Sequence, residues 1–257
     1  MPKYKIGITE AGDAGIDLSW VDKLNSVDGA VLITKNIMPD FISEVLKHQD
    51  KIILHATVTG FGGTVIEPNV PTPRDEFIAI MSLIKDGFPQ EKIVIRIDPI
   101  VPTPKGIHTA YQTMQLYMKM GFSRYRISVL DMYPHVRERF AKHNIKLPYA
   151  PDSFSANDSQ MRSVDEMLYK AKIFWRCVDG SDPLRIESCA EPKLKEPIMC
   201  GCISSYDLNL LGLEDDTEND SVGYQRKNCL CYAGKVELLE HKRRCPHNCL
   251  YCYWKDE

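Results

Sequence analysis

Three cysteines lie close together near the C-terminus, in the stretch CPHNCLYCYW (245–254). Cys245, Cys249 and Cys252 are separated by three and two residues, so one short loop carries all three thiols. Such a loop can hold an iron–sulfur cubane in which each sulfur binds a different iron. A structural zinc ion would take four protein ligands in a closed tetrahedron. The loop supplies three, which leaves one metal position open for another ligand.

The chain has nine cysteines, all in its last third. Cys189, Cys202, Cys229 and Cys231 would make a second set of four ligands, enough for a closed auxiliary [4Fe–4S] cluster. A structural zinc site, or buried thiols that pack as small apolar side chains, are the alternatives. Disulfides are disfavoured, because the count is odd, the chain is not small and no export signal stands at its start. Cys177, in a helical pattern, is predicted to pack in the core.

The composition is that of a globular protein without membrane spans. The hydrophobic fraction of 44% and the charged fraction of 26% are ordinary for such proteins. A formal net charge of −3 argues against a generally basic nucleic-acid-binding protein, although local basic patches stay open. No apolar run reaches the roughly 18 residues of a membrane-spanning helix, and no apolar signal peptide is present. We therefore expect a cytoplasmic protein.

Short β-branched apolar runs alternate with longer stretches of helical periodicity. The runs cover residues 3–9, 29–34, 51–58, 92–97, 125–130 and 184–188, and the helical patterns cover 41–48, 75–87, 109–121 and 164–178. This alternation predicts βαβ units and a parallel sheet. We predict an α/β fold in which residues 1–188 form a partial or complete TIM-like parallel (β/α) barrel. The cysteine-rich iron–sulfur segment 189–257 would pack on this barrel without being an independent domain. A doubly wound open sheet is the main structural alternative. Residues 143–163 and 214–220 break the pattern and are predicted to be an irregular segment and an acidic, solvated loop.

Polar side chains stand at or just beyond the ends of these predicted strands. In parallel α/β folds the carboxyl ends of the strands share one rim, where active sites form. We therefore expect one shared site, with Lys35, Arg96 and Asp98 as candidate catalytic groups. The other candidates on this rim are Asn36, Thr59, Glu67, Asn69, Ser128, Asp131, Glu187 and Glu191. His55 lies inside an apolar strand and is predicted to be a hydrogen-bonded core residue.

Two small basic groups lie near these candidates in the sequence. Residues 241–244 (HKRR) directly precede the cysteine loop, and His135, Arg137 and Arg139 follow the fifth predicted strand. Each is interpreted either as a site for an anionic group or as a solvated basic turn. Neither group is long or aromatic enough to indicate nucleic acid.

The cysteine loop carries the CxxxCxxC signature of the radical S-adenosylmethionine enzymes, with the customary aromatic residue, Tyr251, before the last cysteine. Other stretches resemble the spore photoproduct lyase and DNA photolyase-like branch of that superfamily, over residues 30–252. These stretches are VLITKN, TVTGFGGTVIEPNVPTPRDEF, IVIRIDPIVPTPKG, YRISVLD and GYQRKNCLC. The chain looks like a bacterial subgroup of this branch that has its cysteine loop at the C-terminus. In most members the three cysteines follow the first strand, and a GGE motif follows the second; here Lys35 and Asn36 stand at that place.

The resemblance implies that Cys245, Cys249 and Cys252 hold a catalytic [4Fe–4S] cluster whose open iron binds S-adenosylmethionine. It implies that Tyr251 lies beside the adenine, and it favours the second set of four cysteines as an auxiliary cluster. The residues expected to line the cofactor and substrate cavity are Lys35, Asn36, Thr59, Glu67, Asn69, Arg96, Asp98 and Ser128. Cys200 would be a candidate hydrogen-atom donor, as cysteine is in the photoproduct lyases.

The sequence therefore favours a lyase-like radical S-adenosylmethionine enzyme with a small or nucleotide-like anionic substrate. Nucleic acid is an alternative substrate, and an electron donor such as flavodoxin or ferredoxin would reduce the cluster. Two other hypotheses stay open. One is an iron–sulfur protein for electron transfer or binding that does not cleave the cofactor, and the other is a zinc-stabilised barrel.

Overall fold

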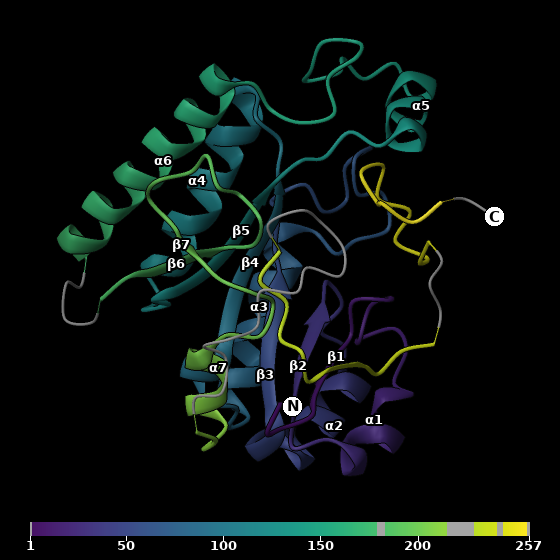
Figure 1. The fold of residues 1–257 in the computed structure, drawn as a ribbon, viewed down its shortest axis with the longest axis vertical. Coiled ribbons are helices and arrows are strands. Elements are labelled where there is room, and N and C mark those ends of the chain that lie inside the picture. The colour runs from purple at the N-terminus through teal and green to yellow at the C-terminus, as the bar shows by residue number, and fades with distance from the viewer. Residues whose placement is uncertain (1, 179–182, 215–228, 241–243, 256–257) are drawn as a thin grey trace.

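The computed structural model describes residues 2–178, 183–214, 229–240 and 244–255, and its centre is an eight-stranded parallel sheet (Figure 1). The strands are β1 (Ile6–Ile8), β2 (Gly29–Thr34), β3 (Ile52–Thr57), β4 (Ile93–Ile100), β5 (Arg124–Val129), β6 (Arg185–Ser188), β7 (Ile198–Met199) and β8 (Lys235–Glu237). All six strands expected from the sequence are present, and every strand pair is parallel. The predicted α/β class with a parallel sheet is confirmed.

The strand order across the sheet is β7-β6-β5-β4-β3-β2-β1-β8. A doubly wound sheet reverses its order at a switch point, whereas β1 to β6 follow one another without a reversal. The doubly wound alternative is therefore wrong. Strand β8, from the cysteine-rich segment, pairs with β1, so the end of the chain returns beside its beginning. Strand β7, from the same segment, extends the other edge of the sheet.

Helices follow most of the strands, and their starts are set by proline. The helices are α1 (Trp20–Lys23), α2 (Pro39–Lys47), α3 (Pro73–Lys85), α4 (Pro104–Met118), α5 (Pro134–Lys142), α6 (Asp158–Val178) and α7 (Ser205–Leu210), with short 3-10 turns at Leu24–Ser26, Gln49–Lys51 and Gln90–Lys92. Proline opens α2, α3, α4 and α5, since it fixes a helical φ and the first turn needs no N–H donor there. Thr72 and Thr103 cap α3 and α4 by accepting backbone N–H groups.

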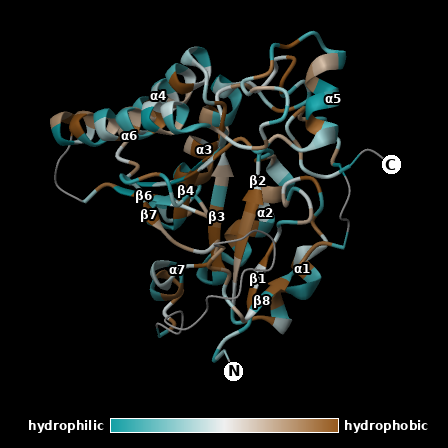
Figure 2. Cartoon of the chain, turned by 45° about the horizontal axis from the view of Figure 1, so that its top comes forward, coloured by the Kyte–Doolittle hydropathy of each residue, from teal (hydrophilic) through white to brown (hydrophobic). Residues whose placement is uncertain are grey.

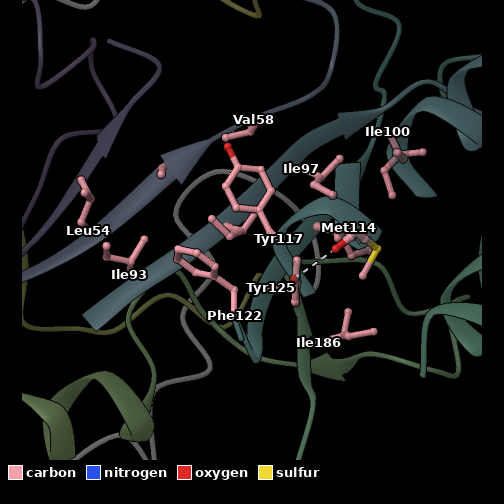
Figure 3. Close-up of a cluster of buried hydrophobic side chains, with 14 of the residues drawn as sticks. Leu54, Val58, Ile93, Ile97, Ile100, Met114, Tyr117, Phe122, Tyr125 and Ile186 are labelled. Carbon is pink, nitrogen blue, oxygen red and sulfur yellow. Dashed lines mark hydrogen bonds between the residues drawn. The ribbon is translucent and has the colours of Figure 1, made fainter. Parts of the chain in front are cut away.

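The two faces of the sheet are covered differently, because successive strand residues point to opposite sides. Side chains such as Leu54 and Ile95 pack with apolar residues of α1 to α6 in the larger core. Tyr117 of α4 and Phe122 lie in this core with their ring centroids 5.4 Å apart (Figure 3). On the other face Ile53 pairs with apolar residues of α7 and its flanks. Figure 2 shows apolar residues concentrated along the strands between these layers.

Several expectations about individual segments are corrected by the structure. Cys177 was expected in the core, but it lies exposed near the end of α6. Helix α6 begins at Asp158, so the last part of the segment 143–163 is helical and not irregular. Residues 215–220 and 241–243, which cover most of the acidic loop and of the basic run, lie outside the described residues. None of the described helices combines the length and apolarity needed to cross a bilayer.

His55 is buried, as predicted, on the same face of β3 as Ile53. Its Nε2 atom has no hydrogen-bond partner among the described residues, so the structure does not provide the expected hydrogen bond at that atom. Burial, together with the nearby positive charges of Arg126, Arg96 and Arg124, holds the pKa of His55 well below its usual range. The imidazole is therefore neutral at physiological pH.

Candidate functional site

A cavity of about 590 Å³ lies at the carboxyl ends of the strands. Its wall includes Lys35, which follows β2, Arg96 and Asp98 of β4, and Ser128 of β5. Cysteines from both sets also line it: Cys245, Cys249 and Cys252 from the C-terminal loop, and Cys189, Cys202 and Cys229 from the second set. The structure thus brings thiols that are far apart in sequence to one cavity, together with the candidate catalytic groups.

Residues 245–252, here called the cysteine loop, lie near α5 at the end of the chain (Figure 1). Cys249 is only 6% exposed, whereas Cys245 and Cys252 are partly exposed. Burial raises the pKa of Cys245 to about 11. Burial also raises the pKa of Cys249, although the charge of Lys35 opposes the shift. The thiols of Cys245 and Cys249 are therefore protonated at neutral pH in the metal-free protein, and binding a metal there would release protons.

The cysteine loop is anchored first by His247 and Asp13, neither of which was among the predicted site residues. His247 Nε2 lies 2.9 Å from Asp13 Oδ2, and its Nδ1 lies 3.1 Å from Asn69 O. Asp13 also accepts the backbone N–H of Lys35 at 2.8 Å and the Thr34 hydroxyl at 2.5 Å. Burial alone would raise the pKa of Asp13, but the hydrogen bond and charge of His247 hold it below its usual range. Asp13 therefore ties the cysteine loop to the ends of β1 and β2.

A second anchor is the Glu67 carboxylate, which is fully buried. Tyr251 donates its hydroxyl to Glu67 Oε1, Lys35 Nζ donates to the same oxygen at 2.8 Å, and Thr59 donates to Oε2 at 2.6 Å. Asn69 donates to Pro246 O at 2.8 Å. Glu67, Thr59 and Asn69 were expected to line the cavity, but none of them belongs to its wall: Glu67 and Asn69 bond to the cysteine loop, and Thr59 bonds to Glu67.

Two other sequence candidates also stabilise loops around the cavity. Asn36 does not line the cavity and donates to Gly15 O at 3.2 Å, which fixes the loop after β1. Arg139 of α5 donates to the carbonyl oxygens of Cys252 and Trp254, the latter at 2.6 Å. Arg137, from the same predicted basic group, binds Ser153 O at 2.9 Å instead. Of these two arginines, Arg139 is the one bonded to the cysteine loop.

The cavity wall also includes an arginine–carboxylate pair. Arg96 Nη2 and Ser128 Oγ both donate to the carboxylate of Asp98. Burial alone would lower the pKa of Arg96, but the charges of Asp98, Cys202 and Glu10 outweigh it and raise the pKa. Arg96 Nε is buried and has no hydrogen-bond partner among the described residues. The guanidinium therefore stays charged at the cavity and keeps donor capacity.

The second set of cysteines comes together from three segments of the chain. The Sγ atoms of Cys189 and Cys229 are 3.8 Å apart, and those of Cys229 and Cys231 are 2.7 Å apart. Arg126 holds the third segment, because its Nη1 donates to Cys202 O at 2.6 Å. Cys200 does not line the cavity, and its Sγ accepts from Arg126 Nη2 at 3.3 Å.

Glu187 and Glu191, two of the predicted rim residues, have structural contacts. Glu191 accepts the backbone N–H of Val129 at 2.9 Å. Glu187 is fully buried and binds Arg126 Nη2 at 2.8 Å and Arg124 Nη2 at 3.1 Å. These arginines hold its pKa at about 2, against the tendency of burial to raise it. Asp131, by contrast, lines the cavity as expected.

Comparison with known proteins places the chain in a family. A family model described as a domain of unknown function (DUF1848) matches residues 18–254. The chain belongs to the DUF1848 family. No curated protein and no solved structure shows significant similarity to it.

The donor set of this DUF1848 chain fits an iron–sulfur group by chemistry. Thiolates are the ligands that such clusters use, and both sets border the same cavity. The described residues contain no group of three or more His, Cys, Asp or Glu side chains arranged around a single ion. A cluster differs from a single ion in this respect, because each thiolate binds a different iron.

Replacing Asp13 by alanine is expected to loosen the cysteine loop of the DUF1848 chain. The variant loses a buried hydrogen-bond pair with His247, a cost of about 1–2 kcal/mol. A loss of about 1.4 kcal/mol raises the fraction of protein with an open cysteine loop tenfold. Without metal, Cys249 of the variant should therefore react with iodoacetamide about tenfold faster than Cys249 of the wild type. Mass spectrometry of the native protein measures this rate. Asp22→Ala, which removes an exposed carboxylate on α1, is the control. Equal rates in the two variants would show that Asp13 is not an anchor.

Proposed function

We propose that this protein is a radical S-adenosylmethionine-type iron–sulfur enzyme on an incomplete parallel (β/α) barrel. The observation that carries the proposal is the shared cavity: Cys245, Cys249 and Cys252 line it together with Arg96 and Asp98. The sequential strand order, with β8 beside β1, supports a barrel-like arrangement. Active sites of such folds lie at the carboxyl ends of the strands, where this cavity is found.

In this proposal Cys245, Cys249 and Cys252 hold a [4Fe–4S] cluster, and one iron is left for S-adenosylmethionine. When bound and reduced, these groups supply hydrogen-atom abstraction from the substrate. The contribution of the protein itself is to hold the cysteine loop in position. Asp13, Glu67 and Arg139 fix the loop from three sides, which places the thiols before any metal arrives.

Cationic and acidic side chains both line the proposed cavity. Arg96 and Lys35 are among the cations, and each is paired with a carboxylate. Arginine binds carboxylate and phosphate groups through paired N–H donors, so an anionic substrate suits this wall. The volume of about 590 Å³ is within the range of small-molecule sites. A small acid or a nucleotide-like molecule is therefore the proposed substrate class, with nucleic acid as the alternative.

Cys189, Cys202, Cys229 and Cys231 are proposed to hold a second [4Fe–4S] cluster. Three of these four thiols border the cavity, so this centre would face the substrate as well. A flavodoxin- or ferredoxin-like donor would supply electrons, and the proposed location is the cytoplasm. Both proposals require a reducing environment, in which thiols stay available for iron.

The deciding experiment is anaerobic purification followed by measurement of iron, sulfide and zinc per chain, and of 5′-deoxyadenosine after reduction with S-adenosylmethionine. We expect about eight irons for two clusters, or about four for one, and formation of 5′-deoxyadenosine. A bound cluster that does not cleave S-adenosylmethionine would instead indicate an electron-transfer or binding protein. Zinc without iron or sulfide would leave a zinc-stabilised fold and refute the proposal.

A further inference from the structure

A second, smaller cavity of about 70 Å³ lies behind Lys35. Thr34, Lys35 and Thr57 line both this cavity and the main one, so they form the partition between the two. The rest of the small cavity is lined by apolar residues and by Asp75 and Glu76 of α3. A cavity needs about 10–15 Å³ of space of this kind to hold one water molecule, so this cavity has room for ordered water.

The polar groups at this cavity lack partners in the described part of the chain. Glu76 is 5% exposed, and neither of its carboxyl oxygens has a hydrogen bond there. The hydroxyl of Thr57, which is 4% exposed, is likewise without a partner. Buried polar groups in native proteins are almost always paired, with ordered water where no protein group is in reach. Two unpaired groups at one cavity therefore indicate water inside it.

Glu76 is surrounded by charged groups from several elements. Lys35 lies at the end of β2, Asp13 and Glu67 belong to loops after strands, and Asp75 precedes it on α3. Tyr117 of α4 is the remaining titratable neighbour. Burial raises the pKa of Glu76 to about 9, the charge of Lys35 opposes this shift, and the three carboxylates reinforce it. Lys35 lines both cavities and donates to Glu67 at 2.8 Å; burial alone would lower the pKa of Lys35, but the charge of Glu67 outweighs it and raises the pKa.

We propose that the small cavity holds ordered water that connects the Glu76 carboxyl to Lys35, so that Glu76 supplies protons to Lys35 and thereby to the main cavity. When Lys35 Nζ gives a proton to an oxyanion of a substrate in the main cavity, the Glu76 O–H proton crosses the water and restores the ammonium. Glu76 is then a carboxylate until solvent returns a proton. The presence of a proton acceptor in the main cavity is the part of this proposal that rests on the proposed function. The presence of water and the protonation of Glu76 do not depend on that function.

The first test compares the pH dependence of unfolding of the full-length chain and Glu76→Gln. Between about pH 5 and 9 native Glu76 keeps its proton while the unfolded chain loses it, so the stability of the wild type falls as pH rises. The ratio of the wild-type to the Glu76→Gln unfolding constant should therefore rise about tenfold per pH unit. The exposed residue Glu91 provides the control, because Glu91→Gln should leave the wild-type profile unchanged. A pH-independent ratio for Glu76→Gln would overturn the proposal.

Two further measurements need no enzymatic activity. The infrared band of a protonated carboxyl should be present in wild type at pH 7, lost in Glu76→Gln and lost in wild type above pH 10. A high-resolution crystal structure should show water bonded to Glu76 and Lys35, and a dry cavity would overturn the proposed route. Because none of these measurements uses S-adenosylmethionine, they can succeed even if the proposed enzymatic function is wrong, and they can fail while that function stands.

Discussion

On the proposed function, Cys249→Ser is expected to remove the cluster of the cysteine loop and to lower 5′-deoxyadenosine formation by about a hundredfold or more. Cys249 is the most buried of the three loop thiols, and Leu250 N donates to Ile66 O at 2.9 Å directly beside it. Serine keeps the shape of the loop but offers a hard oxygen in place of the soft thiolate that iron–sulfur clusters use. Iron and sulfide analysis should show a loss of about four irons per chain relative to the wild type.

The matched control is Cys177→Ser on the exposed end of α6, away from the cavity. It should keep the wild-type iron content and activity, because Cys177 is in neither predicted ligand set. Circular dichroism and the unfolding midpoint show whether either variant is misfolded. If Cys249→Ser retains full iron and activity, the cysteine loop is not the cluster site and the enzymatic proposal fails with it.

Local patterns predicted the repeated units of the fold well. The six predicted strands and four predicted helices are present, because each buries an apolar face whose period is visible in the sequence. Strands β7 and β8 were missed, since they have two and three residues and depend on pairing with β6 and β1. Pairing of such short strands is decided by tertiary context and not by propensity.

The sequence predicted where the site lies better than it predicted the role of each residue there. The rule that polar residues gather at carboxyl strand ends correctly brought Arg96, Asp98 and Ser128 to one cavity. It could not distinguish them from Glu67, because one hydrogen-bond partner of Glu67, Tyr251, is 184 positions away in the sequence. Asp13 was missed although the same rule applied to the segment after β1 would have included it. Which strand-end groups face a ligand and which hold a loop depends on contacts between distant segments.

Glu187→Gln is expected to have the largest effect on stability. Glu187 binds Arg124 and Arg126 in the interior, and Arg185 Nε donates to its Oε1 at 2.5 Å. Glutamine keeps the volume but removes the charge, which leaves Asp207 as the remaining buried carboxylate bonded to Arg124 and Arg126. Removing one partner from a buried ion pair costs about 3–5 kcal/mol. Urea unfolding followed by circular dichroism measures this loss.

The pH dependence separates this ion network from simple loss of packing. The pKa of Glu187 is about 2 in the folded protein, whereas the ordinary value for this carboxyl is 4.5. Its contribution is therefore complete above pH 4.5 and falls as pH drops towards 2, by about 3 kcal/mol in all. Glu187→Gln should lack this acid-sensitive part. Asp158→Asn, which breaks the exposed pair with Lys193, should leave both the midpoint and the acid profile unchanged.

The same variant connects stability to the second set of cysteines. Arg126, which Glu187 orients, donates to the carbonyl oxygens of Gly201 and Cys202. If the network only stabilises the fold, Glu187→Gln at permissive temperature should retain all its iron. If it also positions the segment that carries Cys202, the variant should lose up to about four irons while the cysteine loop keeps its own. If Glu187→Gln has the stability and the acid profile of the wild type, both roles are refuted. Each role requires the charge of Glu187 to interact with the arginines.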